Sequence, residues 1–104
     1  MKLWIDDVRP APNGYCWIKR VDTAKETIEK MDYKWNQVYW GGIELIDIDH
    51  DAGEYVQYGG DYIKLLDWLE ETGRSYPIRI HSMNPVGVEN IRAIIERNNW
   101  TEVK

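Results

Sequence analysis

Short apolar runs, bounded by polar or turn-forming residues, predict the strands of this chain. They lie at residues 3–5, 15–21, 43–49 and 77–82, with a further short strand expected at residues 101–104. Their β-branched and aromatic content is typical of strands. Between the first two runs, Pro10 and Pro12 favour neither a helix nor an interior strand. We therefore expect a loop there, with no full helix.

Three stripes of apolar residues at helical spacing alternate with these strands, at residues 23–31, 62–69 and 85–95. Thr23 and Glu26 have the spacing of a capping box at the start of the first stripe. Asn84 and Pro85 supply a capping side chain and a first-turn proline for the last. Strands that alternate with helices imply a mostly parallel sheet covered on both faces. The expected fold is thus a three-layer α/β domain in which no full helix follows the first strand.

Residues 32–42 are the least regular part of the sequence. We expect a loop there, with a short strand at residues 37–40. The rings of Trp35, Tyr39 and Trp40 fit either packing or a platform on which a nucleobase stacks. The length of 104 residues suits one domain with one core, so residues 1–104 are taken as a single domain.

Composition excludes several classes of protein. The net charge of -5 argues against a broad basic surface for duplex DNA. No apolar run approaches the roughly 18 residues of a membrane helix, and the first residues lack the features of a signal peptide. We therefore expect a cytoplasmic protein without a membrane partner. The single Cys16 forms no internal disulfide and disfavours structural zinc.

Three of the predicted strands run directly into polar clusters. In a parallel sheet, such clusters meet at the carboxyl edge of the strands. Crowded carboxylates repel one another unless a cation or a proton is present. Their oxygen atoms suit Mg²⁺, Mn²⁺ or Ca²⁺, while two nearby histidines keep a softer transition metal open. The clusters contain Asp6 and Asp7; Asp47, Asp49, His50 and Asp51; and His81 and Ser82.

Each of these residues also has a simpler interpretation. Aspartate is common in turns, so an acidic pair alone also fits the end of a strand. His50 fits a structural bridge between loops, Ser82 a turn cap, and Asn84 a helix cap. The planar fork of Arg9 suits a carboxylate as well as a phosphate. Both histidines of the sequence nevertheless fall in the clusters, and imidazole is well suited to proton transfer near neutral pH.

The segments LWIDDVRPAP, DHDAG and HSMNPVG together resemble the motifs of cyclic-phosphate processing receiver domains. The resemblance extends from about residue 2 to residue 97. It implies a receiver-like, flavodoxin-like fold and metal-dependent action on cyclic or terminal phosphates. Ala52 stands where leucine is usual, and no convincing lysine ends the fifth strand, which weakens two-component phosphotransfer. The motif positions are Asp6, Asp7, Arg9, Asp49, His50, Asp51, His81, Ser82, Asn84 and Gly87.

The resulting hypothesis is a metal-dependent phosphoesterase acting on a cyclic or terminal phosphate of a nucleotide or RNA end. The alternative is a non-catalytic or phospho-accepting receiver-like module, because Asp49 and Ser82 fit both. The sequence leaves open the natural substrate, the pathway, the oligomeric state and which histidine is the acid. The expected metal ligands for Mg²⁺ or Mn²⁺ are Asp6, Asp7 and Asp49; the catalytic residues His50, His81, Asp51 and Ser82; and the phosphate-binding residues Arg9, Asn84 and Gly87.

Overall fold

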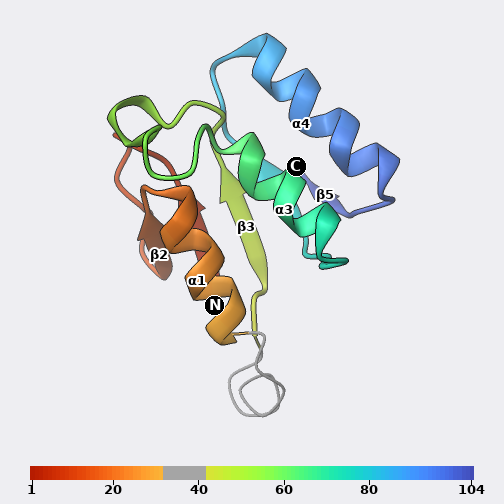
Figure 1. Ribbon diagram of the computed structural model, residues 1–104, viewed down its shortest axis with the longest axis horizontal. Coiled ribbons are helices and arrows are strands. Elements are labelled where there is room, and N and C mark those ends of the chain that lie inside the picture. Colours follow the sequence, from red (N-terminus) through yellow and green to blue (C-terminus); the bar gives the residue numbers. More distant parts are fainter. Residues whose placement is uncertain (32–41) are drawn as a thin grey trace.

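The computed structural model describes residues 1–31 and 42–104, and its strands form one parallel sheet (Figure 1). The strand order is β2-β1-β3-β4-β5, and every neighbouring pair is parallel. The short strand expected at residues 37–40 lies outside the described residues. The observed strands are β1 (Lys2–Ile5), β2 (Tyr15–Ile18), β3 (Leu45–Ile48), β4 (Ile78–Ile80) and β5 (Glu102–Val103).

Helices follow three of the strands. They are α1 (Val21–Met31), α3 (Ile63–Glu71) and α4 (Pro85–Arg97), and a short 3-10 helix, η1 (Gly53–Tyr55), follows β3. The predicted start of α4 is confirmed, because the Asn84 side chain accepts a hydrogen bond from the Gly87 N–H group. The α1 helix begins two residues earlier than predicted, since the Ala24 N–H group already bonds to the Arg20 carbonyl. The fold class is confirmed as a small flavodoxin-like, receiver-like α/β domain.

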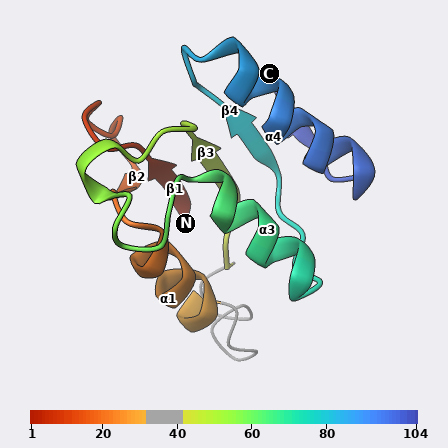
Figure 2. The ribbon, with the colours of Figure 1, turned by 45° about the horizontal axis from the view of Figure 1, so that its top comes forward.

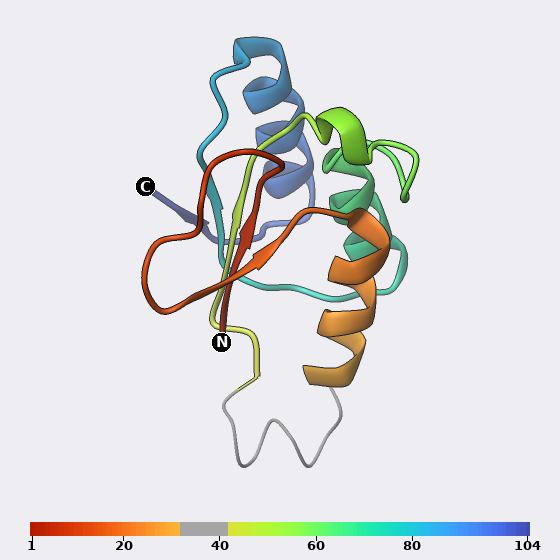
Figure 3. The same ribbon diagram turned by 90° about the vertical axis from the view of Figure 1, so that its left-hand side faces the viewer.

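The described α-helices all lie on one face of the sheet (Figure 3), and α3 packs between α1 and α4 (Figure 2). We expected helices on both faces and therefore three layers. From β2 onward, each connection crosses the sheet in the same direction, and right-handed crossovers in one direction share a face. The connection from β1 to β2 runs the other way, and its residues 6–14 form no helix, as predicted. This loop covers part of the opposite face.

The core lies between the helices and the sheet. Alternate strand residues point into it, as expected from the two-residue period of a strand. The residues between them, such as Trp4 and Asp47, point to the face without helices. The buried core includes Leu3, Ile5, Ile18, Ile46, Ile48 and Ile78 from the strands and Val21, Ala24, Ile28, Leu65, Leu66, Leu69, Ile91, Ile94 and Ile95 from the helices.

Candidate metal and phosphate site

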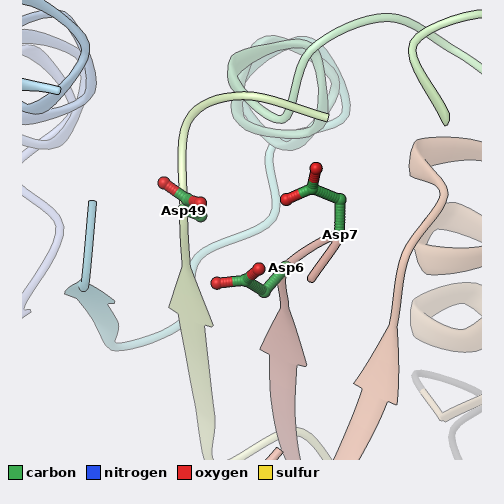
Figure 4. Close-up of side chains that lie close together, drawn as sticks. All are labelled: Asp6, Asp7 and Asp49. Carbon is green, nitrogen blue, oxygen red and sulfur yellow. The ribbon is translucent and has the colours of Figure 1, made fainter. Parts of the chain in front are cut away.

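Three aspartates meet at the carboxyl edge of β1 and β3 (Figure 4). Asp6 and Asp7 follow β1 directly, and Asp49 follows β3. The Asp49 N–H group donates to the Ile5 carbonyl at 2.9 Å, which continues the ladder past the end of β3. One carboxylate oxygen of each aspartate lies within 4.8 Å of the others. The predicted convergence of these three side chains is therefore confirmed.

The electrostatics of this group favour a cation. Burial, together with the negative charges of Asp6 and Asp49, raises the pKa of Asp7. Three carboxylates in close proximity repel one another, and a divalent ion would relieve that repulsion. Their hard oxygen atoms are the ligands that Mg²⁺ and Mn²⁺ prefer. The residues present therefore fit a hard divalent ion, and we call Asp6, Asp7 and Asp49 the carboxylate group.

Asp6 is the most firmly held of the three. Its side chain is fully buried. Burial acts to raise the pKa of Asp6, but hydrogen bonds from the Arg9 and Val8 N–H groups and from His81 together lower it. Both N–H groups donate to Asp6 Oδ1 at 2.9 Å, and His81 Nε2 lies 2.9 Å from Oδ2. This network holds Asp6 ionised and fixes the direction of its carboxylate.

His81 lies between two buried carboxylates on the face without helices. Its Nδ1 is 2.7 Å from Asp47 Oδ1, while Nε2 faces Asp6. The other oxygen of Asp47 lies 3.3 Å from Arg79 Nη1. We had expected Asp47 among the crowded acids, but the alternation of β3 directs it to His81 instead. His81 thereby links the carboxylate group to the middle of the sheet.

Trp4 on β1 and Arg9 in the loop that follows β1 cover this histidine. The Trp4 indole stacks on the His81 ring, with the ring centroids 3.8 Å apart and an interplanar angle of 4°. Trp4 Nε1 donates to the Arg9 carbonyl at 2.9 Å, and Arg9 Nη1 donates to the His81 carbonyl at 2.9 Å. These contacts explain how Asp47 is fully buried on a face that no described helix covers.

A pocket of about 270 Å³ opens beside the carboxylate group. Asp49 belongs to both, so the pocket adjoins the predicted metal ligands. Its wall brings together five predicted site residues and Met83, which was not predicted from the sequence as a site residue and whose side chain is 81% exposed. The lining residues are Arg9, Asp49, Asp51, Ser82, Met83 and Asn84.

His50 takes a different position from His81. Its Nδ1 lies 2.8 Å from Asp51 Oδ1, and Asn84 Nδ2 donates to the other Asp51 oxygen at 3.4 Å. A Cβ atom added at Gly87 would lie 2.5 Å from His50 Cγ, so glycine permits the close approach of α4 to this ring. Neither histidine lines the described pocket. The expectation that both transfer protons stays a prediction, as do the phosphate contacts expected of Arg9, Asn84 and Gly87.

Two residues that shape the surroundings of the carboxylate group were not predicted from the sequence. Asp61 accepts a hydrogen bond from the Ala52 N–H group at 2.9 Å and so holds the loop after β3. Gly53 has a φ of +54°, and a side chain there would collide with the Asp7 carboxylate. The signal available in the sequence was weak, because a glycine or an aspartate in a loop has many uses.

A parallel sheet in this order, with acidic residues after β1, an aspartate after β3 and a hydroxyl after β4, defines a receiver-like domain. The family model for the cyclic-phosphate processing receiver domain matches residues 1–97. The chain belongs to this family, and the resemblance found in its motifs is confirmed. Searches of curated proteins and of solved structures found no significant match. No helix among the described residues is long and apolar enough to cross a membrane.

Proposed function

We propose that this protein is a metal-dependent phosphoesterase that acts on a cyclic or terminal phosphate of a nucleotide or RNA end. One observation carries the proposal: Asp49 belongs both to the carboxylate group and to the wall of the pocket. A phosphate in that pocket would contact Arg9, Ser82 or Asn84 beside a site suited to Mg²⁺ or Mn²⁺. When bound, such an ion would screen phosphoryl oxygens and lower the pKa of water.

The residues around the pocket would bind and orient the phosphate. The guanidinium of Arg9 is anchored by the His81 carbonyl, and its planar fork can hold two phosphate oxygens. The amino end of α4 begins after Asn84, which also lines the pocket, and helix amino ends favour anions. Ser82 is oriented by the Asn84 N–H group, which donates to its Oγ at 3.1 Å. These residues would leave the reacting bond facing the carboxylate group.

We assign proton transfer first to His50. The Asp51 carboxylate accepts from Nδ1, which leaves Nε2 to exchange a proton with the substrate or with water. Such a transfer is typically worth about 10²–10⁴ in rate. His81 faces a carboxylate with each ring nitrogen, so we assign it the positioning of Asp6. Its expected share in proton transfer requires that it leave one of these partners during the reaction.

The test is an assay of the purified protein with Mg²⁺ or Mn²⁺ and a panel of substrates. The panel contains 2′,3′-cyclic and 3′,5′-cyclic nucleotides and RNA with a cyclic terminal phosphate. We expect metal-dependent formation of a phosphomonoester, which EDTA and Asp49→Asn abolish and which His50→Ala lowers by about 10² or more. Glu29→Gln, an exposed change on α1, is the control for the loss of one charge. The absence of turnover with either metal would contradict the proposal.

A second candidate is a phospho-accepting receiver module. Asp49 after β3 and Ser82 after β4 lie where such a receiver has its acceptor and its hydroxyl. Lys104 follows β5 directly, but its Nζ pairs with Glu102 Oε2 at 2.9 Å. Labelling of Asp49 by acetyl phosphate, without turnover of any cyclic phosphate, would favour this candidate over the hydrolase.

A further inference from the structure

An aromatic and cationic cluster borders the carboxylate group on the side away from the pocket. The Trp17 side chain on β2 is 38% exposed. Lys19 Nζ lies 4.4 Å from the centroid of the Trp17 ring and 5.7 Å from that of the Tyr55 ring. The two rings come from segments far apart in the sequence, and the Lys19 ammonium group lies near a ring of β2 and a ring of η1. We call Trp17, Lys19 and Tyr55 the Trp17 cluster.

Direct contacts connect the Trp17 cluster to the carboxylate group. Trp17 Nε1 donates to the Asp6 carbonyl at 2.8 Å. Gly53, the first residue of the 3-10 turn that contains Tyr55, faces the Asp7 carboxylate. In the sheet, β2 lies beside β1, whereas Asp49 and the pocket lie on the side of β3 and β4. The carboxylate group therefore lies between the pocket and the Trp17 cluster.

On the basis of the proposed function, we propose that the Trp17 cluster binds the nucleoside that carries the reacting phosphate. An exposed indole offers a surface for a nucleobase, and every base has a π-face that can stack on it. The Lys19 ammonium adds a cation next to the rings, where it can contact a base oxygen. The substrates would then be nucleoside phosphates or single-stranded RNA ends, which proteins commonly recognise by stacking unpaired bases on aromatic rings.

The binding test uses the full chain with Mg²⁺ and adenosine 3′-monophosphate or inorganic phosphate, measured by titration calorimetry. Trp17→Leu is expected to weaken nucleotide binding about 5- to 100-fold and to leave phosphate binding unchanged. Trp17→Phe keeps a ring but removes the hydrogen bond to Asp6, so it should retain most of the nucleotide affinity. Trp68→Leu is the matched control, because Trp68 lies on α3 with a guanidinium 4.6 Å from its ring centroid.

The variants separate stacking from a structural role. Equal losses with Trp17→Phe and Trp17→Leu, for both nucleotide and phosphate, would overturn the inference, because the indole would then only position Asp6. If Trp17→Leu fails to fold, Lys19→Gln replaces it. That variant leaves the indole in place and should weaken nucleotide binding without changing phosphate binding; unchanged nucleotide binding would count against the inference.

Turnover separates this inference from the proposed function. With a cyclic nucleotide, Trp17→Leu should raise KM more than it lowers kcat, while a base-free substrate such as glycerol 1,2-cyclic phosphate should be unaffected. Equal effects on the two substrates would refute the nucleoside site and leave the phosphoesterase proposal intact. An absence of turnover with both substrates, together with a loss of nucleotide binding but not of phosphate binding in Trp17→Leu, would refute the phosphoesterase proposal and support the nucleoside site.

Discussion

Replacing Asp7 by asparagine should make the metal-free protein more stable. The three carboxylates of the group have oxygen atoms within 4.8 Å of one another. Two unit charges at such a distance repel by about 1 kcal/mol in bulk water and by about 3 kcal/mol at an effective dielectric constant of about 20. His81 offsets part of the charge on Asp6, and solvent screens the rest. We therefore expect Asp7→Asn to raise the free energy of unfolding by about 1–2 kcal/mol.

The effect of Asp7 should depend on pH in a defined direction. The pKa of Asp7 is raised above the ordinary value of 3.8 by burial and by the charges of Asp6 and Asp49. Its ionised form therefore destabilises the fold, fully so above the folded-state pKa. As the pH falls through that pKa toward 3.8, the carboxyl takes up a proton and the destabilisation fades. The stability difference between Asp7→Asn and the wild type should narrow accordingly.

Thermal and urea unfolding in EDTA and then in Mg²⁺ measure both effects. One kcal/mol should move the Tm of a domain of this size by about 4–8 °C. Mg²⁺ at 100 times its Kd should stabilise the wild type by about 2.7 kcal/mol and Asp7→Asn by clearly less. Glu29→Gln controls for the change in net charge. A less stable Asp7→Asn in EDTA, or equal stabilisation of both proteins by Mg²⁺, would refute the reasoning.

Three further predictions concern the surroundings of the site. Asp47→Asn and His81→Gln should each lower the free energy of unfolding by about 1–3 kcal/mol. A double-mutant cycle of the two changes should show a coupling energy of at least about 0.5 kcal/mol. Additive effects would contradict the buried hydrogen bond between the two side chains. Gly87→Ala should lower the free energy of unfolding, measured in urea, by about 1–3 kcal/mol, because the added methyl group meets the His50 ring. A smaller residue in place of His50 should restore the stability. An unchanged free energy of unfolding in Gly87→Ala would show that the His50 ring moves freely. A bidentate ion pair with Arg92 on α4 lowers the pKa of Glu102 to about 2. The stabilisation of the fold by ionised Glu102 is therefore fully present above pH 4.5 and is lost as the pH falls toward 2. Glu102→Gln should cost about 1 kcal/mol at pH 7 and flatten this acid dependence in a pH series of urea unfolding curves, whereas an unchanged slope would contradict the pairing.

The strands and the convergence of the carboxylate group follow from local signals in the sequence. Apolar runs that end in acidic residues, together with one rule about parallel sheets, are enough to bring Asp6, Asp7 and Asp49 to one edge. The cap of α4 is also local, because Asn84 and Gly87 are three residues apart. The placement at one edge and the helix cap need no knowledge of the strand order, whereas the approach of the carboxylate oxygens to within 4.8 Å requires that β1 pair with β3.

The layers and the partners of His81 depend on information that the sequence pattern lacks. The face that each helix covers follows from the order of the strands, and that order is a property of the whole sheet. His81 meets Asp47 and Asp6 across 34 and 75 residues, so no local spacing reveals the pair. The position of Asp47 could have been predicted, because the alternation of β3 places it opposite Ile46 and Ile48.

The central claim is tested most directly by the reaction of a nucleoside 2′,3′-cyclic phosphate with the purified protein, followed by phosphorus NMR in Mg²⁺ and in EDTA. The account predicts that a phosphomonoester forms only with the metal and that Asp49→Asn abolishes its formation, because the metal would lose one of its ligands. Unchanged substrate in every metal tested, with Asp49 labelled by acetyl phosphate, would contradict it.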